Sequence, residues 1–385
     1  MIFMNVRKTY NLSDICRFVT SRTCNIENYI STENMLPNKG GITSPSNIPS
    51  GSAIAYQLGD VLISNIRPYF QKIWQANCDG ACSADVLCIR ANEKADCKYL
   101  YYLLSQQKFF DYVMSGAKGC KMPRGDKSQI MQWQISLPPL AEQKRIADIL
   151  SAIDGKIELN RRINANLEQQ AQALYKSWFV DFEPWGGVMP EDWREGIASD
   201  FYDITIGKTP PRKETQWFSN SKKNHVWISI SDMGKNGMFL GQSSEYLTPL
   251  AIEKFNIVIV PDSTVLLSFK LTVGRVSISD GAVTTNEAIA HFKTKKQDLL
   301  EYTYLSLKNY EFSALGSTSS IATAVNSKTI KSMRWIMPNH DLIKQFHEKA
   351  GPIFNMIKQN EKENNNLSTL RDTLLPKLMS GEIKI

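Results

Sequence analysis

The sequence predicts an α+β protein in which two similar mixed α/β domains are joined by two long helices that form an antiparallel coiled coil. Two observations lead to this fold class. Segments of the second half repeat segments of the first half, and each repeat ends in about 45 residues with the apolar spacing of a coiled coil. The 385 residues are therefore expected to form a pseudo-twofold internal repeat: a domain at 1–140, a helix at 141–184, a domain at 185–340 and a helix at 341–385.

The repeat consists of matched segments roughly 200 residues apart. The segment "YISTENM" (29–35) resembles "WISISDM" (227–233), "DVLIS" (60–64) resembles "STVLLS" (263–268), and "DGACSAD" (79–85) resembles "DGAVTTN" (280–286). From residue 116 onward the shift stays at 200, so that it places Gly116 on Gly316, Asp126 on Asn326, Ile130 on Ile330 and Pro138 on Pro338. Duplication of one unit is the simplest explanation.

The mixed part of each half has the pattern of short strands separated by loops. Runs rich in β-branched residues, such as "VLISNI" and "AVTTNEAIAHF", predict strands, and clusters of Gly, Pro and Ser predict the loops between them. The stretch "KYLYYLLSQQKFFDYVMSG" (98–116) predicts one helix. This mixture is typical of a globular α/β domain.

The helical parts carry their core positions in alternating steps of four and three, which is the spacing of a heptad seam. These positions are Ile146, Leu150, Ile153, Ile157, Asn160, Asn164, Leu167, Ala171, Leu174 and Trp178 in the first helix, and Phe346, Ala350, Ile353, Ile357, Asn360, Asn364, Leu367, Arg371, Leu374 and Leu378 in the second. The run predicts coiled-coil packing. Gly155 and the pair Gly351–Pro352 are candidate breaks or late helix starts.

Four asparagines occupy the centres of the two seams, where apolar residues are expected. An antiparallel pair brings the centres together, so Asn160 is expected beside Asn364 and Asn164 beside Asn360, flanked by Leu167 and Leu367. A buried amide left unpaired in a slipped register costs about 1 to 3 kcal/mol, so such a pair fixes register and direction. The alternative is that the asparagines are solvated on helices that do not pair.

Charge and hydropathy limit the partners and the location. The net charge is +7, and residues 1–140 carry 15 Lys and Arg against 10 Asp and Glu, which permits a nucleic-acid partner. No run of 18 apolar residues occurs, and the apolar part of "MIFMNVRKTYNLSD" is too short for a signal peptide. The expectation is a cytoplasmic chain with no membrane contact.

The enzyme-like strings of the sequence lack residues that their chemistry needs. "GKT" (207–209) has Tyr202 where a phosphate-binding loop needs glycine, and "VPDSTVLLSFK" (260–270) has Ser268 where a metal-dependent nuclease needs a second carboxylate. All seven cysteines lie in the first third and all four histidines after residue 224, which argues against a local Cys/His metal site and favours free thiols. No catalytic, metal or cofactor site is expected in this chain.

Three segments carry a resemblance to a known family. The segments "LPPLAEQKRIADILSAIDGKIE" (137–158), "LYKSWFVDFEP" (174–184) and "LLPKLMSGEI" (374–383) resemble the conserved regions of specificity subunits of type I restriction-modification enzymes. The resemblance covers nearly the whole chain. It includes the order domain, helix, domain, helix, to which the internal repeat leads independently.

The resemblance implies a DNA-recognition subunit that is not itself an enzyme. Each domain would be a target-recognition domain that reads one half of a split sequence in double-stranded DNA. The helices would separate the two domains and bind two modification subunits, which hold S-adenosylmethionine and methylate adenine N6. Larger restriction subunits would act as motors and cut the DNA.

Candidate DNA-contacting residues are polar and basic side chains in loops of both halves. Lysine and arginine are expected mostly at phosphates, while arginine, asparagine, serine and threonine can read base edges. The first domain supplies Arg67, Lys72, Lys118, Lys121, Arg124 and Lys127, and the second supplies Lys208, Arg212, Lys213, Lys270, Arg275, Ser317, Thr318, Asn326 and Lys328. For each of these, ordinary solvated surface charge is the alternative.

The length of the first helix fits a spacer between two DNA-reading domains. Residues 146–178 rise about 50 Å at 1.5 Å per residue, enough to set sites about one turn of the duplex apart. Two other functions remain open at this point: an autonomous nuclease or methyltransferase, and a coiled-coil adaptor that binds only proteins. The broken motifs argue against an autonomous enzyme. Binding of DNA by the chain together with a modification subunit would argue against an adaptor that binds only proteins.

Overall fold

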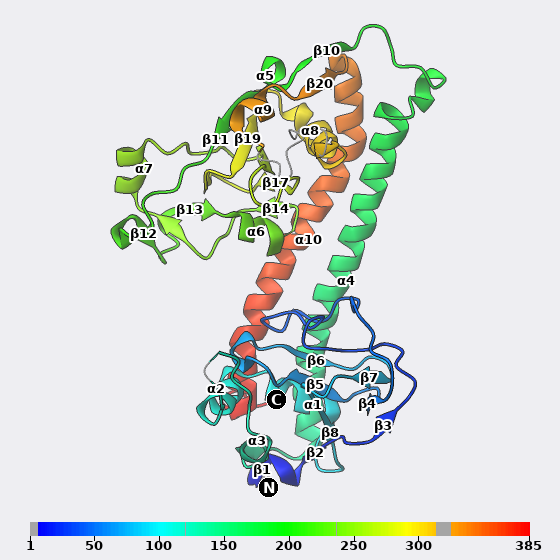
Figure 1. The fold of residues 1–385 in the computed structure, drawn as a ribbon, viewed down its shortest axis with the longest axis vertical. Coiled ribbons are helices and arrows are strands. Elements are labelled where there is room, and N and C mark those ends of the chain that lie inside the picture. The colour runs from blue at the N-terminus through cyan, green and yellow to red at the C-terminus, as the bar shows by residue number, and fades with distance from the viewer. Residues whose placement is uncertain (1–6, 120, 236, 313–324) are drawn as a thin grey trace. The chain divides into compact units, whose positions relative to one another are not determined.

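The computed structural model describes residues 7–119, 121–235, 237–312 and 325–385, and the chain divides into two compact units. Unit 1 consists of Met1–Ile157 together with Asn365–Ile385, and unit 2 consists of Glu158–Asn364. Two long helices contribute to both units: α4 (Leu140–Phe179) and α10 (His340–Ser380) (Figure 1). Each unit therefore contains one globular domain and a segment of each helix.

Unit 1 is built from short strands and three short helices besides its segments of α4 and α10. Its strands are β1 (Lys8–Asn11), β2 (Cys16–Phe18), β3 (Arg22–Thr23), β4 (Ala53–Tyr56), β5 (Val61–Ser64), β6 (Ile73–Gln75), β7 (Gly80–Cys82), β8 (Val86–Ala91) and β9 (Gln134–Leu137). Its helices are the 3-10 turns η1 (Leu12–Asp14) and η2 (Pro68–Phe70), and α1 (Cys97–Leu104), α2 (Gln107–Ser115) and α3 (Lys127–Met131).

Unit 2 also consists of short strands and short helices besides its segments of α4 and α10. Its strands are β10 (Arg194–Ile197), β11 (Asp203–Ile206), β12 (Phe218–Ser219), β13 (His225–Ile228), β14 (Phe239–Leu240), β15 (Tyr246–Leu247), β16 (Val265–Ser268), β17 (Val276–Ser279), β18 (Thr284–Thr285), β19 (Ile289–Lys293) and β20 (Arg334–Met337). Its helices are η3 (Glu183–Trp185), α5 (Ala198–Phe201), η4 (Thr215–Trp217), α6 (Ile230–Lys235), α7 (Pro249–Phe255), η5 (Gln297–Leu299), α8 (Leu300–Lys308) and α9 (Ser327–Lys331).

The central sheets of the two units have the same strand order, which confirms the internal repeat in the fold. In unit 1 the order is β2-β8-β5-β6, all antiparallel. In unit 2 it is β11-β19-β16-β17, also antiparallel, with β14 added in parallel at the edge. A two-stranded ribbon, β1-β9 or β10-β20, leads into the long helix of each half.

A local turn shows the repeat at the level of single hydrogen bonds. The backbone N–H of Ser31 donates to Oδ1 of Asn34 at 2.6 Å, and the backbone N–H of Ser229 donates to Oδ2 of Asp232 at 2.8 Å. These residues belong to the matched segments 29–35 and 227–233. Serine and an Asx residue three positions later are therefore matched because both copies close the same turn.

The predicted helix at 98–116 is two helices in the structure. α1 ends at Leu104, and Gln106 has the extended backbone of an N-cap (φ −72°, ψ 145°) before α2 begins. The Oγ of Ser105 donates to the carbonyl of Tyr101, so its side chain closes the last turn of α1. The amphipathic pattern did not reveal this break because both segments bury apolar residues in the same core.

The long helices run through the candidate breaks. Gly155 lies inside α4, and both Gly351 and Pro352 lie inside α10. The ring nitrogen of Pro352 has no hydrogen to donate to the preceding turn, which weakens α10 at that point. Tertiary packing offsets this loss, because the neighbouring residues Ala350 and Phe354 are buried in the core of unit 2.

Each unit closes its own core around segments of both helices. In unit 1, Ile146 and Leu150 of α4 and Leu378 of α10 join the core formed by α1, α2 and the central sheet. In unit 2, Tyr175 of α4 and Phe346 of α10 join the core of the second domain. The buried face of each helix is broader than a two-stranded seam because it packs against a domain as well as against the other helix.

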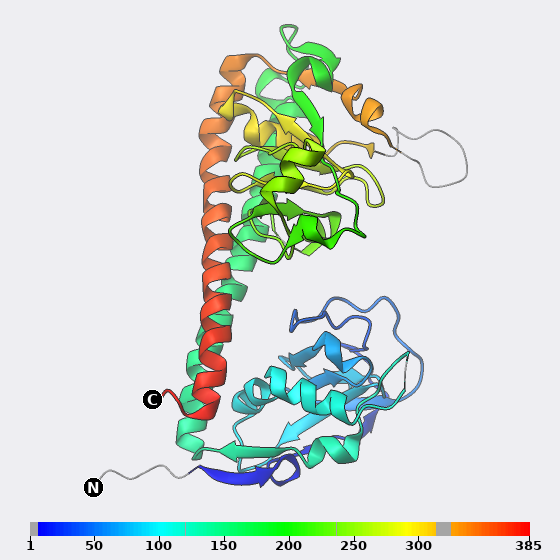
Figure 2. The same ribbon diagram turned by 90° about the vertical axis from the view of Figure 1, so that its left-hand side faces the viewer.

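The antiparallel direction is fixed by polar contacts within unit 2. The side-chain amide of Asn160 donates to Oδ1 of Asn364 at 3.0 Å, and that of Asn360 donates to Oδ1 of Asn164 at 2.8 Å. In these two contacts the residue number rises along α4 while it falls along α10, so the helices run antiparallel. Both views draw the two helices side by side (Figures 1 and 2). The predicted antiparallel coiled coil is confirmed.

The seam is less buried at its centre than the heptad pattern suggested. Asn160 is fully buried, but Asn164, Asn360 and Asn364 are half-buried, as are Leu167 and Leu367. Two helices alone leave the flanks of a seam open to water, so the amides beside Asn160 stay partly solvated. Leu167 gains cover from the core of unit 2, against which it packs.

Candidate nucleic-acid interface

The structure brings together two loops of unit 1 that the sequence nominated separately. The backbone N–H of Arg67 donates to the carbonyl of Pro123 at 2.8 Å, and that of Gly125 donates to the carbonyl of Asn65 at 3.3 Å. The N–H of Asn65 in turn donates to the carbonyl of Asp85 at 2.8 Å. We call the described residues 64–67, 83–85, 115–119 and 121–129 the first loop junction, since backbone hydrogen bonds connect these segments.

Two of its cations are paired with carboxylates. Lys118 and Arg124 exchange backbone hydrogen bonds of 3.0 and 2.9 Å. The ammonium of Lys118 lies 2.8 Å from Asp126, and the guanidinium of Arg124 lies 3.1 Å from Asp85. These side chains are exposed, so the pairs are weak and can be exchanged for phosphate contacts.

Asp126 is positioned by the start of α3. Its carboxylate accepts hydrogen bonds from the backbone N–H groups of Ser128 and Gln129, as an N-cap does. The bond from Lys118 and these two N–H groups hold its pKa below the usual range. In the second half Asn326 caps α9 in the same way by accepting from the N–H of Thr329 at 2.9 Å, so the predicted match of these two positions has a structural cause.

Arg67 differs from the other cations of the junction. Its backbone is left-handed (φ 50°, ψ 62°), and its half-buried guanidinium forms no ion pair or hydrogen bond with any residue that the structure describes. Its Nε is buried without an acceptor. Buried unpaired donors are uncommon and costly, so among the described cations of the junction Arg67 is a candidate for contact with a ligand.

The remaining cations of the first domain fall into two kinds. Lys72 is held by the chain itself, because its ammonium donates to the carbonyl of Thr32 at 2.6 Å and burial lowers its pKa. Lys121 is exposed, and no carboxylate of the described residues lies within ion-pair distance of it. The Nζ of Lys127 lies 6.0 Å from the ring centroid of Phe18. Lys121 and Lys127 therefore have ammonium groups available for phosphates.

The second domain has a hairpin at the place equivalent to residues 64–72. Between β16 and β17, Leu271 has a left-handed backbone (φ 62°) and is 97% exposed. Beside it, Lys270 is exposed, with its Nζ 5.5 Å from the ring centroid of Phe269. Arg275 points back into the domain instead, where its Nη1 donates to the carbonyl of Ile230 at 2.8 Å.

The loop 207–218 contains two cations with structural contacts and one without. The ammonium of Lys208 donates to the carbonyls of Phe255 and Asn256, at the end of α7. The guanidinium of Arg212 pairs with Glu245 at 2.7 Å and lies 4.4 Å from the ring centroid of Trp227. Lys213 is exposed without a described partner.

The last candidates lie in and before α9. Lys328 is exposed on that helix. Ser317 and Thr318 lie outside the described residues. The hairpin tips at 64–72 and 268–275 lie at equivalent places in the two domains.

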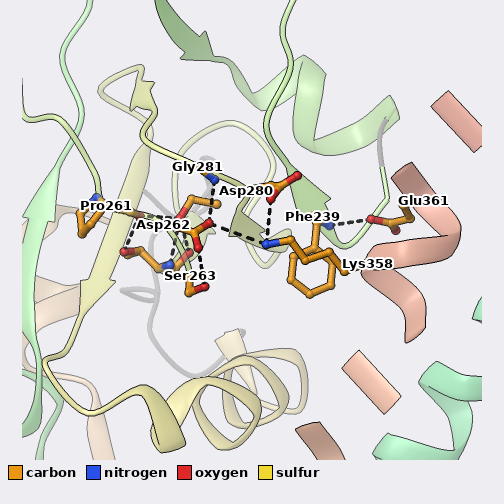
Figure 3. Close-up of polar contacts among 10 residues, drawn as sticks. Phe239, Pro261, Asp262, Ser263, Asp280, Gly281, Lys358 and Glu361 are labelled. Carbon is orange, nitrogen blue, oxygen red and sulfur yellow. Dashed lines mark hydrogen bonds and ion pairs between the residues drawn. The ribbon is translucent and has the colours of Figure 1, made fainter. Parts of the chain in front are cut away.

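A contact that the sequence did not reveal attaches the second domain to α10. The carboxylate of Glu361 accepts hydrogen bonds from the backbone N–H groups of Met238 and Phe239, at 2.7 and 3.0 Å (Figure 3). A Cβ at Gly237 would overlap this carboxylate, so glycine permits the approach. Burial raises the pKa of Glu361, while the two N–H groups act in the opposite direction.

One turn earlier on α10, Lys358 completes the attachment. Its ammonium lies 2.8 Å from Asp280 and 3.8 Å from Asp262, and Asp262 also accepts a hydrogen bond from the N–H of Gly281 at 2.6 Å (Figure 3). Lys358 and Glu361 thus hold two loops of the second domain at the helix. Heptad spacing could not find them because both lie beside the seam.

In unit 1 a residue of the segment "LPPLAEQKRI" attaches the first domain to α4 by hydrogen bonds. Gln143 is buried, accepts from the N–H of Asp96 at 3.0 Å and donates to the carbonyls of Lys94 and Pro138 at 3.0 and 2.9 Å. It fastens the start of α4 to the start of α1. The equivalent position in the second half is Ile343, which is buried among apolar residues, so the second half has no counterpart of these side-chain hydrogen bonds.

The described part of the chain contains neither a cluster of metal-ligating side chains nor a membrane-spanning helix. No group of three His, Cys, Asp or Glu side chains there is placed to hold a metal ion, and its six cysteines form no disulfide. None of its helices has both the length and the apolar character needed to cross a bilayer.

Comparisons with known proteins give one result for both halves. The chain matches the family model described as type I restriction modification DNA specificity domain at residues 7–169 and again at 190–367. It is 26% identical over 460 residues to the type I restriction enzyme HindI specificity subunit of Haemophilus influenzae, covering 98% of this chain and 99% of that protein. It is 26% identical over 310 residues to the MjaIX specificity subunit of Methanocaldococcus jannaschii, covering 75% and 69%. Its fold resembles the S subunit of a type I restriction-modification system from M. genitalium, with TM-score 0.55, 12% identity and 98% coverage of both chains.

Proposed function

The chain belongs to the type I restriction modification DNA specificity family, and we propose that each of its two domains binds one half of a bipartite sequence in double-stranded DNA. It is the specificity subunit of such a system and not its catalytic part. The observation that carries the proposal is that the family model matches twice, once on each of two domains with the same sheet.

The loops described above supply the chemistry for DNA binding. In the first domain, hydrogen bonds between segments pre-order the first loop junction, so little further ordering is needed on binding. Lys121 and Lys127 there, and Lys213, Lys270 and Lys328 in the second domain, have exposed ammonium groups for phosphates. Phosphate contacts position the protein, and a smaller set of side chains reads the bases.

The partners follow from the family. The chain assembles with two methyltransferase subunits and with restriction subunits, and we propose that α4 and α10 provide the surface for the methyltransferases. S-adenosylmethionine is expected in those subunits and adenine N6 as the methylated atom. The complex would act in the cytoplasm, on DNA present there.

We also propose that the helices determine the number of unread base pairs between the two half-sites. α4 has 40 residues and α10 has 41, which correspond to about 60 Å of helix each. Such a helix pair, held in register by the asparagine contacts, is a suitable spacer.

The experiment is co-expression of the chain with the methyltransferase subunit of its own system in cells that lack methylation, followed by sequencing of methylated DNA. The expected result is methyladenine in a bipartite motif with a constant gap. A chain that supports no methylation, and whose complex binds all duplexes equally at every salt concentration, would contradict the proposal. Cutting or methylation by the purified chain alone would instead support an autonomous enzyme.

A further inference from the structure

Two residues with unusual backbones occupy the same place in the two domains. β5 ends at Ser64 and β16 ends at Ser268, and the third residue after each strand is Arg67 and Leu271. Both have a left-handed backbone, with φ 50° and 62°. This conformation is unfavourable for any residue with a Cβ, and neither arginine nor leucine has the short polar side chain that makes asparagine tolerant of it.

Neither side chain at this position has a described polar partner or a buried apolar contact that would account for the strained backbone. The guanidinium of Arg67 has no acceptor among the described residues, and Leu271 is 97% exposed. The left-handed backbone is unfavourable in both domains, and in neither does a described contact of the side chain offset it. Such strain persists where the surrounding structure enforces it, and it clusters at sites that bind ligands.

The surroundings of Arg67 carry further unpaired polar atoms. Among the described residues, seven side-chain polar atoms are buried without a partner, and three of them belong to the first loop junction: Nε of Arg67, Oδ1 of Asn65 and Oε1 of Gln129. The backbone there is well held, since the N–H groups of Asn38 and Lys39 donate to the carbonyls of Phe70 and Gln71 at 2.8 and 3.0 Å. The backbone hydrogen bonds thus hold a half-buried guanidinium at the surface of a loop whose interior has polar atoms without a described partner.

We infer that the left-handed residue of each hairpin tip is a base-reading position: Arg67 binds the N7 and O6 acceptors of a guanine in the major groove, and Leu271 contacts the methyl group of a thymine. The inference rests on the proposed function and adds which residues read which bases. Among the nominated arginines, Arg124, Arg212 and Arg275 already have carboxylate or carbonyl partners, whereas Arg67 has its donors free among the described residues. A planar fork of donors matches guanine, and an apolar side chain distinguishes thymine by its methyl group.

The test uses the complex with its methyltransferase subunits and duplexes of the motif found by methylation sequencing. Arg67→Gly should lower the preference for a guanine at one position of one half-site by about 10- to 100-fold and leave the salt dependence unchanged. Replacing that guanine by 7-deazaguanine should weaken binding of the unaltered complex but not that of the variant. Leu271→Gly should lower the preference for a thymine at one position of the other half-site by about threefold to tenfold. Replacing that thymine by deoxyuridine, which lacks the methyl group, should weaken binding of the unaltered complex but not that of the variant.

A glycine at these positions removes both the strain of the left-handed backbone and the side chain, so matched variants are needed to distinguish the two effects. Gln71→Gly and Ser263→Gly replace left-handed residues of the same two domains, with φ 50° and 57°. They should leave base preference unchanged, while all four glycine variants should keep or raise the melting temperature. If Arg67→Gly or Leu271→Gly loses base preference while its melting temperature stays the same or rises, the residue does not act merely by stabilising the fold.

Other outcomes overturn the inference in recognisable ways. Uniform weakening on all duplexes with a salt slope reduced by about one would make Arg67 a phosphate contact. Loss of assembly with the methyltransferase in Leu271→Gly would make that residue a protein contact. Unchanged discrimination would also refute the inference. In each case the unaltered complex would still recognise its bipartite motif, whereas failure of the proposed function would remove that motif itself.

Discussion

The side-chain amide of Asn160 donates to Oδ1 of Asn364 at 3.0 Å, from the middle of one long helix to the middle of the other. The same amide donates to Glu363 at 2.7 Å, while Oδ1 of Asn160 is buried without a described donor. Asn160 therefore pairs with the other helix at the cost of one unsatisfied acceptor. This is the behaviour of a polar seam residue that favours one register over maximal stability.

The first prediction concerns this pair. The double variant Asn160→Leu with Asn364→Leu should raise the free energy of unfolding by about 1 kcal/mol, because it removes a buried unpaired oxygen and adds apolar burial. Urea denaturation measures it. Asn366→Leu, at an exposed position of α10, serves as the control and should change little. A clear loss of stability in the double variant would show that the amides contribute more than register.

The second prediction concerns the attachment of the second domain to α10. Glu361→Gln replaces one accepting oxygen by an NH₂ group that faces a backbone N–H, so one of the two hydrogen bonds is lost. We expect the free energy of unfolding to fall by about 1 to 3 kcal/mol. Glu348→Gln removes an exposed carboxylate from the same helix and should be nearly neutral. Equal effects of the two variants would contradict the role given to Glu361.

The third prediction separates two lysines of the first loop junction. Lys121→Ala should weaken binding of the complex to all duplexes similarly and reduce the slope of log K against log salt by about one. Lys118→Ala should have a smaller effect because its charge is already compensated by Asp126 at 2.8 Å. Fluorescence titrations at several salt concentrations provide the slopes. A larger effect at Lys118 than at Lys121 would reverse this assignment.

The fourth prediction is a dependence of stability on pH. His291 is buried between Thr205 and Thr285, which lie 3.0 and 2.7 Å from its two ring nitrogens. Burial and the nearby charge of Lys293 lower its pKa to about 3. Below the unfolded pKa near 6.5, the unfolded chain takes up a proton that the folded chain does not, so stability falls with falling pH by up to about 1.4 kcal/mol per unit.

Urea denaturation at pH 7.5, 6.5 and 5.5 tests it with His291→Gln. The variant should be less stable at pH 7.5, because a buried and hydrogen-bonded ring is lost, but its stability should fall less steeply with pH. Comparing the two slopes removes the contributions of the other three histidines, which both proteins share. Parallel slopes would mean that His291 titrates normally.

The fifth prediction concerns the gap in the target. Seven residues inserted after Ile157 and seven after Asn364, at the boundaries between the units, should lengthen each helix by about 10 Å. The unread gap should then grow by up to about three base pairs, with both half-sites unchanged. The methylated motif of the surviving enzyme is the measurement. An active variant with the original gap would refute the spacer role.

A paired control uses insertions after Leu167 and before Ile357. These would shift Lys358 and Glu361 away from the loops that they hold, while the extra length is the same. We expect this variant to lose stability in addition to any change of gap.

Periodicity made the helices and their direction predictable, because the heptad pattern and the centred asparagines are local signals in the sequence. The repeat made two similar domains predictable for the same reason, but the strand order of their common sheet depends on pairings between distant segments. The attachment at Glu361 was not predictable, since its partners are backbone N–H groups more than 120 residues away. Composition nominated the basic loops, but it could not tell the paired Arg212 from the unpaired Arg67, because ion pairs depend on where distant carboxylates lie.

The contact between Arg7 and the carbonyl of Leu378, which spans 371 positions, bears on how the chain is made by the ribosome. The core of unit 1 includes Leu375, Leu378 and Met379, so the first domain to be synthesised is completed only when residues near the C-terminal end emerge. During that time its apolar surface stays exposed to other nascent chains and to chaperones. A ribosome that stalls late, before residue 374, would thus leave the N-terminal domain unfinished although every one of its own strands had been translated.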